Sequence, residues 1–148
     1  MIDETFIEEE QIFFELEQAD FKLAHPEQLI SWIKSILEKE QRELVQLTFI
    51  FCDDAYLIEI NKEYLNHDTY TDIITFPYLE PPLIEGDIFI SIERVAENAK
   101  QYQVSFEQEL HRVMIHGVLH LCGYPDKTEE EAKQMRAKEN EALTLLKL

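Results

Sequence analysis

The sequence is poor in glycine, proline and cysteine. Three glycines and five prolines among 148 residues are too few for a collagen-like chain, a low-complexity chain or a long linker. The two cysteines, Cys52 and Cys122, cannot build a disulfide framework. We therefore expect both to be small buried hydrophobic residues in a protein that works in a reducing compartment.

Long apolar runs are also missing. No stretch reaches the roughly 18 consecutive apolar residues of a membrane-spanning helix. Residues 1–10 are acidic and lack the basic-then-apolar pattern of a signal peptide. These observations predict a cytoplasmic protein with no membrane partner.

Positive charge is scarce. Thirteen Lys and Arg face 31 Asp and Glu, for a net charge of -18, and such a surface repels phosphate chains. Some cations nevertheless gather in the C-terminal third: Arg112, Lys127, Lys133, Arg136 and Lys138. Two interpretations stay open, a local phosphate-binding patch or ordinary ion pairs along an exposed helix with Glu129, Glu130, Glu131 and Glu139.

What is present is a globular pattern, with 45% hydrophobic and 30% charged residues. Periodicity predicts strands over residues 11–17, 43–51, 72–76 and 87–91. It predicts helices over residues 26–40, 53–65, 91–102, 105–122 and 128–147. Prolines and Gly86 separate the last two strands, and Gly123 and Pro125 separate the last two helices. We expect one α+β domain over residues 1–148, with a small mixed four-stranded sheet flanked by about five helices.

The most informative segment is His116-Gly-Val-Leu-His120-Leu-Cys-Gly123-Tyr-Pro-Asp126. Residues four apart on a helix differ by about 40° in direction, so His116 and His120 point the same way and can bind one metal ion. Gly123 suits the left-handed backbone that ends a helix, after which Asp126 can supply a third ligand. Three protein ligands and an open fourth position are typical of a catalytic zinc site.

This spacing matches the metal scaffold of metzincin peptidases, with one decisive difference. Those enzymes carry Glu directly after the first His as general base, whereas this chain has Gly117. His111 and Cys122 lie about 220° and about 240° around the helix from His116, so we expect neither to be a co-ligand. The alternative to a metal site is a chance pair of core histidines.

Several segments resemble the YbeY family of metal-dependent endoribonucleases, which act in ribosomal RNA maturation. Residues 116–124 match the first nine positions of the family's pattern His-Gly-x-Leu-His-Leu-x-Gly-Tyr-Asp-His. Upstream, residues 71–77 resemble its Thr-Asp-Val-Leu-Ser-Phe-Pro strand and residues 86–88 its Gly-Asp-Ile strand. Residues 61–64 resemble its Asn-x-x-Tyr, and residues 109–110 its Glu-Leu. The resemblance implies a mixed sheet with helices on both sides and a metal cleft beside the His-bearing helix.

The chain departs from the family pattern at two places. Asp126 stands where the family usually has a third His, after Pro125 in place of the usual Asp. A carboxylate is a legitimate zinc ligand, so this change tunes the site without abolishing it. Leu65 stands where the family usually has Arg after Asn-x-x-Tyr, a plausible phosphate contact. Nearby His67 is the candidate substitute, with a solvated loop side chain as the alternative.

The resemblance implies one zinc ion on His116, His120 and Asp126, and hydrolysis of single-stranded ribosomal RNA by a metal-activated water. A ribosomal protein or the small ribosomal subunit would be a further partner. Beyond the metal ligands, the candidates for catalysis are the cleft residues Asp72, His67 and Arg112, and the candidates for RNA binding are Lys127 and Arg112.

Three other functions stay open at this point. A metzincin-like peptidase is disfavoured by Gly117, and a two-His-one-carboxylate iron oxygenase is disfavoured because helical His-x3-His followed by a Gly turn is a zinc scaffold. A non-catalytic ribosome-assembly factor with a structural metal would require a closed site with four ligands.

Overall fold

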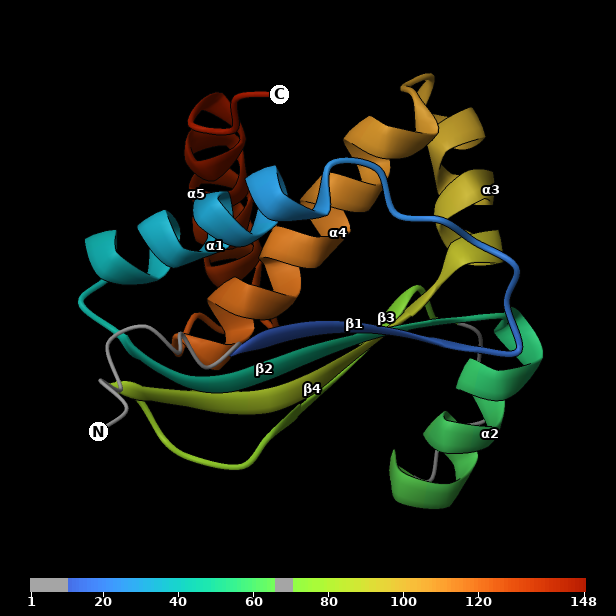
Figure 1. Cartoon of the computed structure of the whole chain (residues 1–148), viewed down its shortest axis with the longest axis horizontal. Helices are drawn as coiled ribbons and strands as arrows, with labels where there is room; N and C mark the ends of the chain where they lie inside the picture. Colours follow the sequence, from blue (N-terminus) through green and yellow to red (C-terminus); the bar gives the residue numbers. More distant parts are fainter. Residues whose placement is uncertain (1–10, 66–70) are drawn as a thin grey trace, which may run out of the picture.

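The computed structural model describes residues 11–65 and 71–148 (Figure 1). Its elements in order are β1 (Ile12–Glu17), α1 (Pro26–Lys39), β2 (Glu43–Cys52), α2 (Asp54–Leu65), β3 (Ile73–Pro77), β4 (Leu83–Ser91), α3 (Ile92–Tyr102), α4 (Phe106–Leu121) and α5 (Glu129–Thr144). The strand order is β1-β2-β4-β3. The first two pairings are parallel and the β3–β4 pairing is antiparallel. The predicted α+β class, with a mixed four-stranded sheet and five helices, is confirmed.

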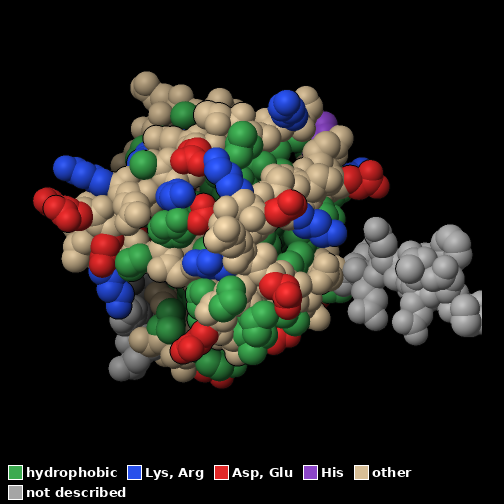
Figure 2. Space-filling view, turned by 90° about the vertical axis from the view of Figure 1, so that its left-hand side faces the viewer, with side chains coloured by type: hydrophobic (Ala, Val, Ile, Leu, Met, Phe, Trp, Pro, Cys, Tyr) green, Lys and Arg blue, Asp and Glu red, His purple; other side chains and the backbone are tan. Residues whose placement is uncertain are grey.

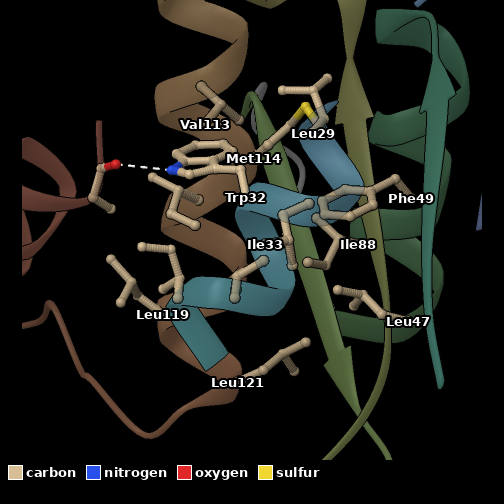
Figure 3. Packing of buried hydrophobic residues seen from close by; sticks show 14 of the residues in the cluster. Leu29, Trp32, Ile33, Leu47, Phe49, Ile88, Val113, Met114, Leu119 and Leu121 are labelled. Atoms are coloured by element: carbon tan, nitrogen blue, oxygen red, sulfur yellow. Dashed lines mark hydrogen bonds between the residues drawn. The ribbon is translucent and has the colours of Figure 1, made fainter. Parts of the chain in front are cut away.

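Helices cover both faces of the sheet. Figure 1 shows α1 and α4 above the strands and α2 below them. The main core lies between the sheet and the upper helices and includes Leu29 and Ile33 of α1, Phe49 of β2, Ile88 of β4 and Met114 of α4 (Figure 3). Each is completely buried, and such burial contributes about 1.5–3 kcal/mol per side chain.

A smaller cluster lies on the opposite face of the sheet. Successive side chains of a strand point to opposite faces, so Ile88 and Ile90 of β4 join the main core while Phe89 between them faces α2. There it packs with Ile74 of β3 and Leu57 of α2. The two apolar faces explain why β4 carries three consecutive hydrophobic residues, Ile88, Phe89 and Ile90, in its second half.

Helix α5 is tied to α1 across the main core. The indole Nε1 of Trp32 donates a hydrogen bond to the Ala142 carbonyl at 2.8 Å (Figure 3). Trp32, Met135 and Ala142 are all buried in the same cluster. This packing holds α5 against the molecule, which matters for the site because α5 contributes a residue to it.

One strand boundary and one helix end differ from the sequence prediction by more than one residue. Strand β4 begins at Leu83, not at residue 87, and Gly86 lies inside it. A Cβ at Gly86 would lie 2.7 Å from the Phe76 carbonyl oxygen and 3.1 Å from Leu121 Cδ2. This glycine therefore allows a close approach of β3 and α4 and is not a separator. The last helix ends at Thr144, three residues short of the predicted 147.

Both cysteines are buried and free, as the sequence predicted. Burial raises the pKa of the Cys52 thiol and of the Cys122 thiol to about 12 in each case. Both are therefore inert hydrophobic side chains near neutral pH. Across the described residues, we find no helix with the length and apolar character to cross a membrane.

Candidate metal centre

Helix α4 places His116 and His120 one turn apart. It begins with a capping box in which the Ser105 hydroxyl accepts from the Gln108 amide at 3.0 Å and the Gln108 side chain accepts from the Ser105 amide at 2.9 Å. The helix then runs through the core to Leu121. Because four residues make just over one turn, the two imidazoles share one face.

A tight turn brings Asp126 back to that face. Gly123 has φ +109°, a left-handed backbone that L side chains rarely adopt, so the chain can reverse directly after α4. Arg42 holds this turn from outside by donating from Nη2 and Nε to the Cys122 carbonyl, at 2.8 and 3.1 Å. The loop position of Asp126 thus depends on a side chain that follows α1.

Three donor atoms converge at the end of α4. Asp126 Oδ2 lies 3.3 Å from His116 Nε2 and 3.3 Å from His120 Nε2. Within the described residues, these are the side chains that form a metal-compatible group, and their ligand atoms all lie within 4.8 Å of one another. We refer to His116, His120 and Asp126 as the triad.

The second nitrogen of each imidazole is engaged by an acceptor. His116 Nδ1 lies 2.6 Å from Glu139 Oε2, and His120 Nδ1 lies 2.9 Å from the Tyr124 carbonyl oxygen. Neither partner has a proton to donate when the carboxylate is ionised, so both Nδ1 atoms carry the proton. Each Nε2 then presents its lone pair to the centre of the triad, which is the arrangement that a metal-binding histidine requires.

Glu139 of α5 is the functional residue that the sequence interpretation missed. It is only 4% exposed, and its other oxygen, Oε1, accepts from Arg112 Nη1 at 2.9 Å and from Arg136 Nη1 at 3.4 Å. One of the two sequence interpretations placed Glu139 on an exposed helix face, in ion pairs with cations of the same helix. Its spacing from the apolar Met135 and Ala142, both buried on the same side of α5, is the signal that would have placed it inside.

The His116–Glu139 contact shifts both pKa values. Burial lowers the pKa of His116, but the hydrogen bond and negative charge of Glu139 outweigh burial and raise it. Burial likewise raises the pKa of Glu139, but His116 and Arg112 outweigh it and lower it. Glu139 is therefore an ionised acceptor near neutral pH and fixes the orientation of the His116 ring.

Two clefts flank the triad and share Asp72, Ile73, His116 and Asp126 in their walls. The first cleft, about 370 Å³, extends between α3, α4 and α5 and includes Arg112 and Arg136. The second cleft, about 510 Å³, extends along α2 and β3 and includes Leu65 and His120. The triad is thus open to solvent on two sides, with its side chains 21%, 26% and 36% exposed.

The comparisons with known proteins agree over nearly the whole chain. A family model described as Endoribonuclease YbeY matches residues 13–147. The chain belongs to this family. An "Endoribonuclease YbeY" of Flavobacterium psychrophilum is 52% identical over 128 residues, which cover 86% of this chain and 91% of that protein. Another of Cytophaga hutchinsonii is 47% identical over 142 residues, covering 95% and 99%.

A solved structure supports the fold of this YbeY-family chain. The solution structure of TM1509 from Thermotoga maritima matches with a TM-score of 0.63 and 28% sequence identity. The match covers 90% of each chain. The family resemblance noted in the sequence is therefore confirmed, and so is the expected placement of helices on both sides of a mixed sheet.

The structure brings some of the other candidate residues to the site. Asp72 lies in the wall of both clefts, where it accepts from Asn98 Nδ2 at 3.4 Å and where burial raises its pKa. Arg112 lies in the first cleft but is bound to Glu139. Lys127 is exposed beside Asp126. His67 lies outside the described residues.

His111 does not join the triad, as its position around helix α4 predicted. His111 is 5% exposed and packs edge-on against Trp32 with 6.3 Å between ring centroids, so it belongs to the core. Arg136 and Lys138 of α5 both form ion pairs, as the second interpretation of these cations expected, although only one of the two pairs runs along the helix. Arg136 pairs with Glu139 along the helix at 3.4 Å, but Lys138 pairs with Glu40 after α1, at 3.1 Å.

Proposed function

We propose that this chain is a zinc-dependent, single-strand-specific endoribonuclease that acts in ribosomal RNA maturation. The observation that carries the proposal is the convergence of His116 Nε2, His120 Nε2 and Asp126 Oδ2, in a chain whose relatives are named endoribonucleases. The open triad also argues against a purely structural metal, because structural zinc sites are closed by four protein ligands. In the described part of the chain, the triad offers three.

The donor set fits zinc. Two imidazole nitrogens and one carboxylate oxygen are ordinary zinc ligands, and both imidazoles have the tautomer that binding needs. A carboxylate on one histidine and a backbone carbonyl on the other are the usual partners that orient such ligands. When bound, a zinc ion supplies Lewis-acid stabilisation of the phosphoryl group and lowers the pKa of water.

The protein's own groups have separate roles in this proposal. His116, His120 and Asp126 hold the metal, and Glu139 keeps the proton on His116 Nδ1. Asp72, which lines both clefts, accepts the proton of the attacking water. Its partial burial suits this role because a carboxylate with a raised pKa is a stronger base.

Substrate contacts must overcome the acidic surface. Figure 2 shows a face on which basic and acidic side chains lie interspersed, without a continuous basic stripe. We propose that phosphate binding is local, with Lys127 beside the triad and Arg112 in the first cleft.

The net charge of -18 suits docking on a basic ribosomal protein of the small subunit, in the cytoplasm. We propose that residues 1–148 act as one domain.

Gly117 argues against the peptidase alternative. A Cβ at this position would lie 2.9 Å from Ile73 Cδ1 and 3.0 Å from Ile88 Cδ1. The residue after His116 therefore packs against the sheet, and a Glu side chain has no room there. No general base of the metzincin type can be supplied from this position.

The test combines metal analysis with cleavage assays on the full chain. We expect about one zinc per chain, cleavage of single-stranded RNA but not duplex RNA or casein, and loss of cleavage with chelator that zinc restores. His120→Ala should lose both metal and cleavage. His25→Asn is the matched control, because His25 is exposed with φ 56° and Asn tolerates that backbone. Chelator-sensitive casein cleavage with intact RNA would overturn the proposal.

A further inference from the structure

The walls of the first cleft carry polar side chains that metal binding does not need. Beyond the triad its walls carry Asn98 and Tyr102 of α3, Glu109 and Arg112 of α4, and Arg136 of α5. Asn98 and Tyr102 are four residues apart, and Glu109 and Arg112 are three apart, so each pair shares one helix face. Its volume of about 370 Å³ lies within the range of about 300–1,000 Å³ found for small-molecule sites.

Glu109 is the unusual group in this cleft. It is 6% exposed, yet within the described residues its carboxylate takes part in no hydrogen bond or ion pair. Burial, and then the charge of Asp72, raise its pKa. Its carboxylate opens onto the cleft, where solvent supplies its hydrogen-bond donors. A ligand that enters the cleft with donors of its own can replace that water and meet Glu109 directly.

The nearby cations do not satisfy Glu109. Both Arg112 Nη1 and Arg136 Nη1 contact Oε1 of Glu139, at 2.9 and 3.4 Å. Each guanidinium carries five N–H donors, so both retain donors for a further acceptor in the cleft. At the rim, Tyr102 is 55% exposed and offers an aromatic face on which a base can stack.

We infer that the first cleft binds an unpaired guanine base of the RNA substrate, with Glu109 accepting hydrogen bonds from guanine N1–H and the N2 amino group. The inference rests on the proposed function, because the cleft adjoins the triad and receives the nucleotide next to the scissile phosphate. A free donor of Arg136 meets guanine O6, which leaves Arg112 for the neighbouring phosphate. Tyr102 stacks on the base at the open side.

The choice of guanine follows from its Watson–Crick edge. Guanine presents two adjacent donors and then an acceptor, which match a carboxylate and then a guanidinium. Adenine and cytosine place an acceptor beside their amino group, and uracil has one donor between two acceptors, so each would leave Glu109 partly unsatisfied. A duplex already uses this edge in base pairing, so the same contact explains a requirement for single strands.

The experiment compares short single-stranded RNAs that differ only in the base beside the cleaved bond. With zinc-loaded protein, we expect kcat/KM to be highest for guanine and to fall when inosine, which lacks the N2 amino group, replaces it. A bidentate base contact discriminates by about 1–3 kcal/mol, which is roughly 5- to 150-fold. Glu109→Gln should abolish this preference and retain cleavage of the other bases. Glu107→Gln, an exposed change on the same helix, should retain the preference.

A binding measurement separates this inference from the proposed function. Calorimetric titration should show guanosine 5′-monophosphate binding more tightly than the adenosine, cytidine and uridine monophosphates, with the difference lost in Glu109→Gln. Guanine-selective binding without RNA cleavage would overturn the proposed function and keep the guanine pocket. RNA cleavage with equal rates for guanine and inosine would overturn the pocket and keep the nuclease. A second zinc ion per chain that Glu109→Gln removes would also overturn it.

Discussion

At the scale of single residues, the packing around Gly117 excludes a side chain that could act as a general base next to His116. Gly117 follows His116 directly, and a side chain there would meet Ile73 and Ile88 of the sheet. Gly117→Glu should therefore lower the free energy of unfolding by at least about 3 kcal/mol, because it overpacks the core and buries a charge. Peptidase activity should not appear.

Urea denaturation and a casein assay check this expectation. Ala137→Glu is the matched control, because Ala137 is exposed on α5 and such changes stay within about 0.5 kcal/mol. A stable Gly117→Glu variant that cleaves casein would show that this position faces the metal.

Asp126 is the triad residue at which the chain departs from its family pattern. Asp126→Ala should lose most zinc affinity, because two protein ligands remain. Asp126→His should keep zinc and move the pH–rate profile of RNA cleavage to lower pH, since a neutral imidazole makes the loaded site more positive by one charge. Competition with a chelator measures affinity. Equal affinity in parent and Asp126→Ala would mean that Asp126 is only a turn residue.

Glu139 Oε2 lies 2.6 Å from His116 Nδ1, so its carboxylate is a direct partner of a triad histidine. Glu139→Gln keeps the shape but removes the charge that orients the imidazole, so zinc affinity should fall by about 10- to 100-fold. A chelator competition at constant pH measures this loss. Glu130→Gln, exposed on the same helix, should leave affinity unchanged, and an equally unaffected Glu139→Gln would remove Glu139 from the metal site.

At the scale of elements, the turn between α4 and α5 sets the position of Asp126. Gly123 has φ +109° with only Pro81 Cγ near its missing Cβ, at 3.6 Å, so backbone conformation and not space requires glycine. Gly123→Ala should cost about 1–3 kcal/mol of stability and weaken zinc binding by moving Asp126. Thermal denaturation and chelator competition measure the two effects. A variant with unchanged stability and affinity would show that the turn tolerates Ala.

The helices and strands themselves follow closely from local sequence. All nine predicted elements are present in the predicted order, because amphipathic periodicity, capping residues and prolines act over a few positions. The main error is the start of β4, four residues earlier than predicted. Gly86 looked like a turn residue, but its role depends on β3 and α4, which lie beside it only in the folded chain.

At the scale of the whole molecule, the net charge of -18 opposes RNA binding. Leu65 lies in the second cleft and is 42% exposed, so Leu65→Arg would place a cation beside the triad. RNA affinity should rise, and the slope of log affinity against log salt should steepen by about 0.7 for a single strand. Fluorescence anisotropy at several salt concentrations measures both.

Leu148→Arg provides the control for net charge. Leu148 is 59% exposed at the C-terminus and receives the same added charge away from the clefts. If both variants gain equal affinity, general attraction and not a phosphate contact in the second cleft explains the effect.

The amino-acid sequence by itself determined the order of the elements, the shared face of His116 and His120, and the turn that returns Asp126. The elements follow from periodicity and breaking residues within each segment, and the two features of the metal site follow from spacing within residues 116–126. Only the tertiary structure decided that Glu139 meets His116, that Gly117 packs on the sheet, and that Glu109 lines a cleft with no partner among the described residues. These contacts join segments that are adjacent only after packing, because which helix faces meet depends on the whole core.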